Sequence, residues 1–446
     1  MSKRFSRRHF VKAASTAVAM PLFIPGSVLG LQAGTPAANS RIGVGFIGMG
    51  KQMKGHLGHA AGKADYAVMA VCDVDTTRRE NAKKTVEEKY AKLERKDWKG
   101  CTAYEDFREV LARKDIDAVF IATPDHWHAS PIIMAAKAKK DIYCEKPLTL
   151  TIAEAKLCLD AVRKHDVVFQ TGSQQRSSKE FLKACEYVRS GRLGKISEVI
   201  VDVGGPSKWC DLPEEPTEPG LNWDLWLGPA PKRAYHSALS PRGLHDHYPA
   251  FRSYKEYSGG GMTDFGAHHY DIMHWGLGMD ESGPDEILPP ETPAKKDVKP
   301  GNPFWEKGAR FIYKKTPVGD NIVVTHGSSG GILFKGEKGT ILVNRGKIEA
   351  TPKEIFNEPL TDKDVRLYNS PSHHDNFLQC IRSRKRPICD VEIGARSVTV
   401  CHLGNLVYWT GKAIKWDAKN WKFADGTDPK LLGRDNREAW QLPSIA

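Results

Sequence analysis

The stretch RIGVGFIGMGK, residues 41–51, sets the fold of the first part of the chain. It begins as an apolar run, which is typical of a buried strand, and continues into a turn with glycines at Gly48 and Gly50. We expect a helix to begin directly after this turn. Backbone N–H groups of such a turn, and of the helix N-terminus, can approach a pyrophosphate closely. The stretch therefore predicts a dinucleotide site that includes Gly48, Met49 and Gly50.

An acidic residue downstream strengthens this interpretation, although Met53 replaces the third glycine of a full GxGxxG motif. Asp73 ends the next apolar run, YAVMAVCD, and lies 25 residues after Gly48. A carboxylate at this position can accept hydrogen bonds from the ribose hydroxyls of a dinucleotide. Because its charge repels a 2′-phosphate, we expect NAD as the cofactor, while Arg78 and Arg79 leave NADP open as the alternative.

Residues 39–172 repeat the order strand, helix, strand. The apolar runs are IGVGFIG, YAVMAVCD, DAVFIAT, DIYCE and VVFQTG, and stretches with helical periodicity separate them. This alternation is typical of a doubly wound parallel sheet, the Rossmann fold. Ligands of such sheets bind beyond the carboxyl ends of the strands. Thr123, Pro124 and His128, which follow DAVFIAT, are therefore expected beside the cofactor.

Residues 173–446 have a different pattern of elements, in which strand-like runs follow one another directly. These runs extend from KISEVIVDVGG (195–205) to GTILVNRGKIEA (339–350). They predict a second α/β domain with an open, largely antiparallel sheet. Residues 281–303 are rich in proline and charge, so we expect a long surface loop there. The helical segments near the C-terminus are expected to pack back on the body.

The first 38 residues resemble an export signal and are set apart from the fold. SRRHFVK (6–12) has the arginine pair, the apolar residue and the lysine of a twin-arginine signal, and an apolar stretch with small residues follows. We therefore expect the twin-arginine export machinery as a partner and a periplasmic or otherwise exported location. The apolar part is interrupted by Pro21, Pro25 and Gly26, so a stable membrane anchor is not expected.

Composition argues against several other classes of protein. The formal net charge is +12, but the positive residues after the first 38 are interspersed with Asp and Glu, and nucleic-acid binding requires clustered positive charge. The nine cysteines include no CxxC pair, so a disulfide framework is not indicated. Close histidine pairs occur, but no cysteine or carboxylate completes a recognisable ligand spacing, so no metal is predicted.

Two further motifs connect the chain to a known family. Glu145-Lys146-Pro147 follows the DIYC strand, and GGGMTDFGAHHYDIMHW places Asp264 four residues before His268. Together with the glycine turn and TPDHWH, these motifs resemble the Gfo/Idh/MocA oxidoreductase family. The resemblance covers nearly all of the chain after the export segment. It implies an N-terminal Rossmann domain, a C-terminal domain with an open antiparallel sheet, and a homo-oligomer that pairs through that sheet.

The same resemblance implies a catalytic triad of Lys146, Asp264 and His268. Oxidation of a secondary alcohol requires a base for the hydroxyl proton, and an imidazole is suited to this role. A lysine can stabilise negative charge that develops on the oxygen. On one helix, Asp264 and His268 would share a face. Cofactor contacts are further expected from Glu145, Lys146, Gln175 and Arg176, and substrate contacts from Trp226, His245, Tyr248 and Asp271.

We therefore expect an NAD(P)-dependent oxidoreductase that acts on a secondary hydroxyl of a sugar, glycoside or cyclitol. A glycosidase that oxidises C3 transiently, eliminates the aglycone, adds water and returns the hydride is an alternative with the same chemistry. A non-catalytic ligand-binding protein on the same scaffold is a third. Export also predicts a tightly bound NAD, because little free NAD is available outside the cytoplasm.

Overall fold

The computed structural model describes residues 40–95, 98–291 and 307–445. Its first part is a six-stranded parallel sheet with the strand order β3-β2-β1-β4-β5-β6. This is the order of a dinucleotide-binding Rossmann sheet, and it confirms the predicted fold. The strands are β1 (Ile42–Ile47), β2 (Tyr66–Cys72), β3 (Thr102–Tyr104), β4 (Ala118–Ile121), β5 (Asp141–Cys144) and β6 (Phe169–Thr171). Strand β3 was not expected from the sequence.

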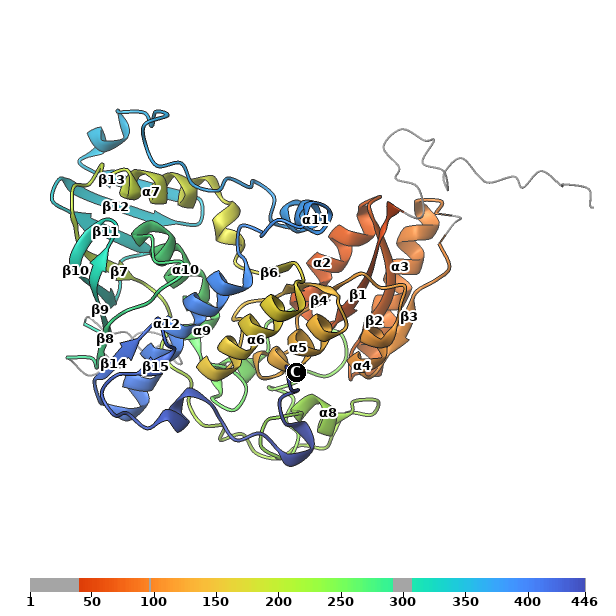
Figure 1. Cartoon of the computed structure of the whole chain (residues 1–446). Helices are drawn as coiled ribbons and strands as arrows, with labels where there is room; N and C mark the ends of the chain where they lie inside the picture. Colours follow the sequence, from red (N-terminus) through yellow and green to blue (C-terminus); the bar gives the residue numbers. More distant parts are fainter. Residues whose placement is uncertain (1–39, 96–97, 292–306, 446) are drawn as a thin grey trace, which may run out of the picture.

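Helices cover both faces of this sheet (Figure 1). One face carries α4 (Phe107–Ala112), α5 (Ala129–Lys137) and α6 (Ile152–His165). The other face carries α2 (Lys51–Gly62), α3 (Thr76–Lys92) and, from much later in the chain, α11 (His373–Ser383).

Local signals explain where these elements begin and end. All six residues of β1 are buried, as expected for a central strand covered on both faces. Helix α6 begins with a capping box, in which the Thr151 hydroxyl accepts from the N–H of Glu154 and the Glu154 carboxylate accepts from the N–H of Thr151. Asp75 caps α3 in the same way by accepting from the N–H of Arg78.

The second part is a nine-stranded sheet with the order β13-β12-β11-β7-β10-β9-β8-β14-β15. Only β7 and β10 pair in parallel within it, so the sheet is largely antiparallel, as predicted. Its strands are β7 (Ile196–Val201), β8 (Glu286–Leu288), β9 (Arg310–Thr316), β10 (Gly319–His326), β11 (Ile332–Gly336), β12 (Gly339–Asn344), β13 (Lys347–Thr351), β14 (Ile414–Asp417) and β15 (Lys422–Phe423). The expected run 339–350 is therefore a hairpin, with its turn at Arg345 and Gly346.

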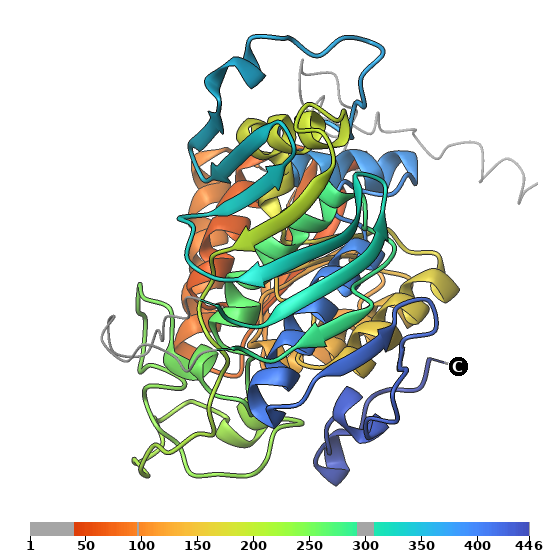
Figure 2. The ribbon, with the colours of Figure 1, turned by 90° about the vertical axis from the view of Figure 1, so that its left-hand side faces the viewer.

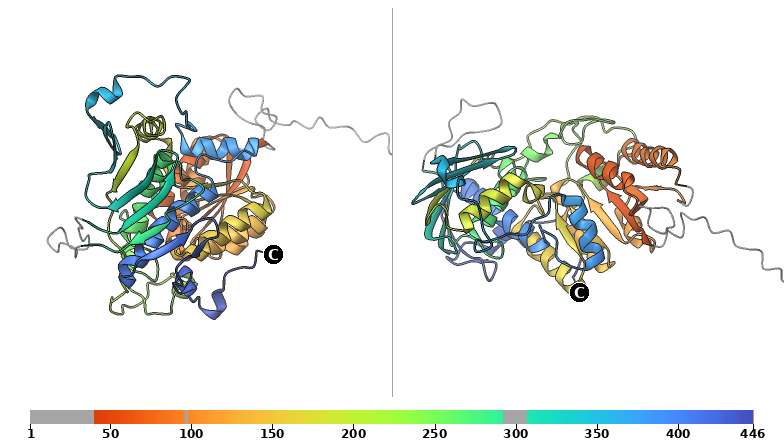
Figure 3. Two further views of the ribbon diagram at one scale, coloured as in Figure 1. Left: turned by 60° about the vertical axis from the view of Figure 1, so that its left-hand side comes forward. Right: turned by 90° about the horizontal axis from the view of Figure 1, so that it is seen from above.

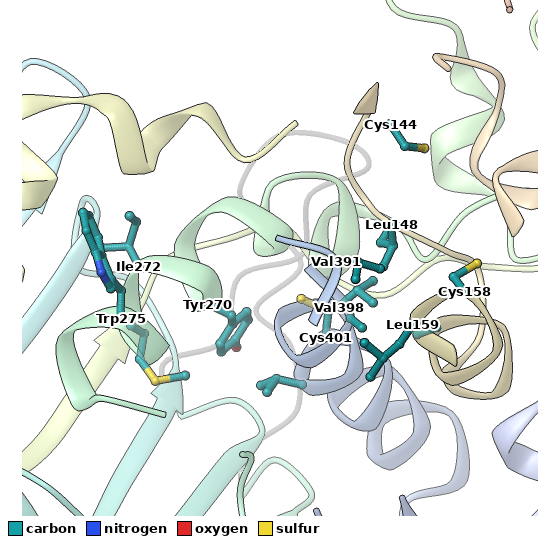
Figure 4. Close-up of a cluster of buried hydrophobic side chains, with 14 of the residues drawn as sticks. Cys144, Leu148, Cys158, Leu159, Tyr270, Ile272, Trp275, Val391, Val398 and Cys401 are labelled. Carbon is teal, nitrogen blue, oxygen red and sulfur yellow. The ribbon is translucent and has the colours of Figure 1, made fainter. Parts of the chain in front are cut away.

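Helices lie between the two sheets and join them into one core. Figure 2 shows the nine-stranded sheet facing the viewer, with the helices behind it. Residues of α6, α10 (Gly266–Leu277) and α12 (Val391–Thr410) meet in one buried cluster, where Leu159, Tyr270 and Val398 pack together with neighbouring side chains (Figure 4). The remaining helices are α7 (Lys179–Arg189), α8 (Trp223–Leu227) and α9 (Gly261–Asp264).

Two expected segments fall wholly or partly outside the described residues. The twin-arginine segment lies outside them, as does most of the loop expected at 281–303; the described part of that loop contains β8. None of the described helices combines the length and the apolar character needed to cross a membrane.

Candidate active site

Two adjoining cavities lie beyond the carboxyl ends of the Rossmann strands, each with an empty volume of about 870 Å³. The first is lined by the glycine turn and by the end of β2, and the second by residues that follow β4 and β5 together with residues of α9 and α10. Gln52, Thr123, Tyr248 and Arg252 line both cavities. A ligand that extends from the first cavity therefore reaches the second.

The glycine turn fits the close approach of a dinucleotide. Gly48 has a φ of +87°, and a Cβ there would lie 2.8 Å from the backbone of Ala122 and Thr123. Gly50 is the N-cap residue that precedes α2 and supplies no side-chain cap, and a Cβ at Gly50 would meet nothing within 4 Å. Because the space beside Gly50 is open, a phosphate could approach the N–H groups that start α2.

The departure from the glycine motif has a packing reason. Met53 is fully buried in the cluster beneath α2, where it fills the space between the helix and the sheet. A third glycine allows close packing of helix on strand, and here a methionine packs instead.

Asp73 lies at the end of β2 and lines the first cavity. Its Oδ2 accepts from the N–H of Met49 at 2.7 Å, and its Oδ1 accepts from the N–H of Asp75 at 2.9 Å. These contacts fix the carboxylate and leave acceptor capacity for ribose hydroxyls. Burial raises the pKa of Asp73, while Arg78 and the two N–H groups act to lower it. The glycine turn and this carboxylate together fit a dinucleotide that the protein would hold at Gly48, Gly50 and Asp73.

Arg78 is already tied to other groups. Its guanidinium donates to the carbonyl of Pro241 and, at 3.5 Å, to that of Gly243, and it lies 3.5 Å from the carboxylate of Asp75. Arg78 lines the first cavity, but these partners hold it against the segment that begins at Pro241.

The three residues implied to be catalytic all line the second cavity. Nζ of Lys146 lies 2.6 Å from Oδ1 of Asp264 and 3.0 Å from its carbonyl oxygen. His268 is 3% exposed, and its Nδ1 has no hydrogen-bond partner in the described part of the chain. A paired lysine and an unpaired imidazole thus face one space.

Charges around the second cavity set the ionisation of these groups. Burial acts to raise the pKa of Asp264, yet Lys146 and Arg252 hold it below its usual value. Burial, followed by the positive charges of Lys146 and Arg345, holds the pKa of His268 well below that of a free imidazole. His268 is therefore neutral near neutral pH, which is the form that accepts a proton.

The expectation that Asp264 and His268 share one helix needs a correction. The helix is interrupted at Phe265, so Asp264 ends α9 and His268 lies in the first turn of α10. Both side chains nevertheless line the same cavity.

The loop after β4 contributes to both cavities. Thr123 lines both cavities, and its hydroxyl oxygen is buried without a partner among the described residues. Pro124 lines the first cavity. His128 lines the second, and its ring nitrogens lie 2.8 Å from the carbonyl oxygen of Pro147 and 2.9 Å from that of Thr123. His128 thus braces the loops after β4 and β5 against each other.

Of the expected cofactor contacts Glu145 and Gln175, only Glu145 lines the second cavity. Glu145 lines it and accepts hydrogen bonds from Gln52 at 3.1 Å and from the backbone N–H of Lys146 at 3.2 Å. Gln175 is buried; its Oε1 accepts from Arg345 at 3.1 Å, and its Nε2 has no partner in the described residues. The residue that lines the cavity at this point is its neighbour, Gln174.

Arg176 and Asp271 do not occupy the positions expected of ligand contacts. The guanidinium of Arg176 lies 2.8 Å from both carboxylate oxygens of Asp271 and 2.7 Å from Asp280, and it packs over the ring of Trp275. Arg176 and Asp271 are 2% and 0% exposed, and neither lines the two cavities. A buried guanidinium requires charged partners, and these two residues supply a structural ion pair.

Two of the expected substrate residues are also differently placed. Trp226 and His245 line the first cavity, on the side of the expected cofactor, and Tyr248 lines both. Trp226 is 5% exposed and stacks on Trp223 with ring centroids 4.6 Å apart. Its surroundings are those of a packing residue at the cavity wall.

Sequence reasoning missed the charged and amide groups that reach the second cavity from distant segments. Arg345 comes from the turn between β12 and β13, and Arg252 from the segment before α9. Gln52 and Gln174 follow the glycine turn and β6. No spacing in the sequence connects these residues. Among the residues that the structure describes, no group of three histidine, cysteine, aspartate or glutamate side chains could hold a metal ion.

The sequence matches two family models. Residues 42–173 match an oxidoreductase family with an NAD-binding Rossmann fold, named GFO_IDH_MocA, and residues 206–442 match the C-terminal alpha/beta domain of the same family. The chain is 32% identical over 154 residues to the uncharacterized oxidoreductase YrbE of Bacillus subtilis, and 32% identical over 152 residues to the myo-inositol 2-dehydrogenase of Thermotoga maritima. Each match covers 34% of this chain and 42% of the relative, so less than half of each relative is matched.

Solved structures share the fold over most of the chain. The WlbA dehydrogenase from Bordetella pertussis, solved with NADH and UDP-GlcNAcA, matches with a TM-score of 0.57 at 18% identity, over 84% of this chain and 99% of that one. Levoglucosan dehydrogenase with NADH and levoglucosan matches with a TM-score of 0.53 at 19% identity, over 84% and 99% of the two chains. With these matches over both of its sheets, the chain belongs to the Gfo/Idh/MocA family of oxidoreductases with an NAD-binding Rossmann domain.

Proposed function

We propose that the protein transfers a hydride between a nicotinamide cofactor and a secondary hydroxyl of a sugar, glycoside or cyclitol. The observation that carries the proposal is the Lys146–Asp264 pair, which lines one cavity together with His268, and this cavity adjoins the dinucleotide site. The relatives point in the same direction, since they include enzymes named for inositol and levoglucosan.

Each of the three residues has a role that its surroundings support. Neutral His268 can accept the proton of the substrate hydroxyl. Lys146, oriented by Asp264, can donate a hydrogen bond to the same oxygen and stabilise the negative charge that develops on it. Bound NAD would supply the hydride acceptor.

NAD is the favoured cofactor. The fixed carboxylate of Asp73 would repel a 2′-phosphate. Arg78, one of the two cations on which NADP binding would depend, is held by Pro241, Gly243 and Asp75. The other, Arg79, donates to the carbonyl of Asp73 at 3.2 Å and lies 3.6 Å from the carboxylate of Glu105. This assignment predicts stronger binding of NADH than of NADPH by the purified protein.

A segment from the second part of the chain supports tight retention of the cofactor. Residues 241–248, here called the strap, form one wall of the first cavity and are bonded to the start of α2. Lys51 donates to the carbonyl of Asp246 at 2.6 Å, Lys54 donates to that of His245 at 2.8 Å, and the hydroxyl of Tyr248 donates to Gln52 at 3.1 Å. The green segment that contains the strap runs from the second part of the molecule to the Rossmann part (Figure 3). A dinucleotide beneath the strap would dissociate only after these contacts open.

Export through the twin-arginine machinery to the periplasm, or otherwise out of the cytoplasm, is part of the proposal and rests on SRRHFVK (6–12). That route carries folded proteins, so the Rossmann domain could take its dinucleotide along. A cofactor held beneath the strap then suits an environment in which little free NAD is available.

We further propose that the protein forms a homo-oligomer through the nine-stranded sheet. The sheet face turned away from the helices carries partly exposed apolar side chains on five neighbouring strands, namely Ile200, Ile312, Val323, Leu333 and Leu342. Apolar patches of this kind are typical of association sites. Light scattering on the purified protein should give a multiple of the 49.6 kDa chain mass; a monomer mass would contradict this proposal.

The test of the proposed activity is direct. Purified protein should contain a dinucleotide that is released on denaturation, and sugars, methyl glycosides and inositols should be screened for reduction of the bound cofactor by its near-ultraviolet absorbance. One or more members of the panel should reduce it. Glycoside cleavage without net reduction would favour the redox-neutral alternative, which the named relatives do not favour because they are dehydrogenases and oxidoreductases.

A further inference from the structure

A row of hydrogen-bonded side chains leads from the second cavity to the partly exposed start of helix α11. Glu145 lines the cavity, and its Oε1 lies 2.8 Å from Nε2 of His56. Nδ1 of His56 in turn lies 2.7 Å from Nε2 of His374. Glu145 and His56 are 3% and 4% exposed, whereas His374 is only partly buried.

The surrounding side chains hold these three groups in line. Gly172 leaves room for the carboxylate, because a Cβ there would lie 2.8 Å from Glu145. The ring of His374 stacks between Tyr143, at 5.6 Å and 15°, and His59, at 4.4 Å and 21°. Packing of this kind fixes both donors and acceptors at hydrogen-bond distance.

We propose that Glu145, His56 and His374 form a proton relay between the substrate cavity and solvent. The inference rests on the proposed function, because oxidation of an alcohol releases a proton with each hydride and reduction of a carbonyl takes one up. His268 and Lys146 are the groups that touch the substrate. His56 and His374 do not touch it; they are positioning residues that act through Glu145 and carry the proton to or from it.

The transfers balance atom by atom. In the inward direction, His374 accepts a proton from water at Nδ1 and passes its Nε2 proton to Nδ1 of His56. His56 then passes its Nε2 proton to Glu145, which releases a proton into the second cavity that it lines and becomes a carboxylate again. In the outward direction, protonated Glu145 returns a proton to Nε2 of His56, whose Nδ1 proton moves to Nε2 of His374, and His374 releases its Nδ1 proton to water. No electrons move in either direction.

Each passage leaves both rings in the other tautomer, and a passage in the opposite direction restores them. A site that alternately reduces and oxidises a retained cofactor would use both directions in every cycle. The relay therefore suits a cofactor that is held beneath the strap and recycled by a second carbohydrate substrate.

The charges that face the relay favour an ionised starting state. Burial acts to raise the pKa of Glu145, but its hydrogen bond to His56 and the charge of Lys146 lower it to about 2. Burial, followed by His56 and His59, lowers the pKa of His374 to about 3. At the outer end, Lys63 and Asp375 form an ion pair of 2.7 Å beside His59. In the starting state of the relay, the ionised carboxylate of Glu145 thus accepts a hydrogen bond from Nε2 of His56.

The test compares His374→Phe with His59→Phe in the full-length holoenzyme. Phenylalanine keeps the ring stacking but carries no exchangeable proton, and neither histidine lines the cavities. The starting state is set for inward passage, so the single turnover to follow is oxidation of bound NADH by the ketone of an active member of the panel. It should slow by about tenfold or more in His374→Phe, with a larger solvent deuterium isotope effect. Added imidazole buffer should restore the rate, and His59→Phe should react like the parent protein.

Two results would overturn the relay. One is a His374→Phe protein with the parent rate and isotope effect and no response to imidazole, which would leave the proposed activity intact. The other needs no turnover. Protein with isotope-labelled histidine should show a nitrogen–nitrogen coupling across the His56–His374 hydrogen bond, and absence of this coupling would mean that the two rings are not hydrogen-bonded. If no member of the panel reduces the cofactor bound to the parent protein, that result would instead contradict the proposed function.

Discussion

Nζ of Lys146 lies 2.6 Å from a carboxylate oxygen of Asp264, across the junction of the two sheets. Lys146 follows β5 of the Rossmann sheet, and Asp264 ends α9 of the second part. The pair therefore forms only when both parts have folded against each other. It fixes the position of the ammonium group in the cavity where His268 also lies.

Replacing Lys146 with Ala should remove the group that stabilises charge on the substrate oxygen. We expect kcat for cofactor reduction to fall by about two to three orders of magnitude, while the dissociation constant of the dinucleotide changes little. Stopped-flow reduction and fluorescence titration with NADH would measure the two quantities. Parent kcat in Lys146→Ala would rule out the assigned role.

The rate should fall at low pH, but only below the usual range of histidine. His268 acts in its neutral form, and its pKa is held well below that of a free imidazole by burial, Lys146 and Arg345. Its competent form is therefore present at neutral pH and is lost as the pH drops through the lowered pKa. In a pH profile of kcat/KM, the acid limb should lie below about pH 6.5.

The same argument predicts the direction of a mutational shift. Arg345→Gln removes a positive charge that faces His268, so the pKa of His268 should rise and the acid limb should move upward by about one pH unit. A downward shift or an unchanged limb would mean that Arg345 does not act on His268.

Loosening the strap should speed the loss of cofactor. Lys54→Ala removes a hydrogen bond to the carbonyl of His245, and Lys54 does not line either cavity. Such a bond contributes about 1 kcal/mol, so we expect dissociation of NAD to accelerate by roughly fivefold. Lys84→Ala, on the exposed side of α3, serves as the control. Equal off-rates in both variants would argue against retention by the strap.

Arg176 should matter for stability and not for cofactor binding. Arg176→Met leaves the fully buried Asp271 without its ion-pair partner, which should lower the free energy of unfolding by about 3–5 kcal/mol. Arg108→Ala, which breaks an exposed pair with Asp106, should cost less than about 1 kcal/mol. Denaturant titrations would compare the two. Unchanged stability with weaker NADH binding would restore Arg176 as a ligand contact.

Export should depend on the arginine pair. Exchange of Arg7 and Arg8 for lysine keeps the charge but removes the twin-arginine pattern, so the protein should remain in the cytoplasmic fraction. Arg4→Lys, outside the pair, should be exported normally. Export of the double variant at the parent level would remove the basis for the proposed location.

The glycine turn and the strand ends show what local sequence can predict. Gly48 and Asp73 were expected at a dinucleotide site because their positions follow from a strand, a turn and the next strand, all within one short segment. Lys146 was expected at the site through the resemblance of Glu145-Lys146-Pro147 to the Gfo/Idh/MocA family, and its position after β5 places it at the same edge of the sheet.

By itself, the sequence determined the order of the Rossmann elements, the glycine turn and the residues at the strand ends, because periodicity and turn chemistry are local properties of a chain. Only the tertiary structure decided that Arg345 and Arg252 line the same cavity as His268, and that Arg176 instead pairs with Asp271 in the core. It also decided that His374, more than 300 residues after His56, meets it at 2.7 Å. The reason is physical: hydrogen bonds and charge pairs between distant segments form where packing brings them together, and no local pattern records that meeting.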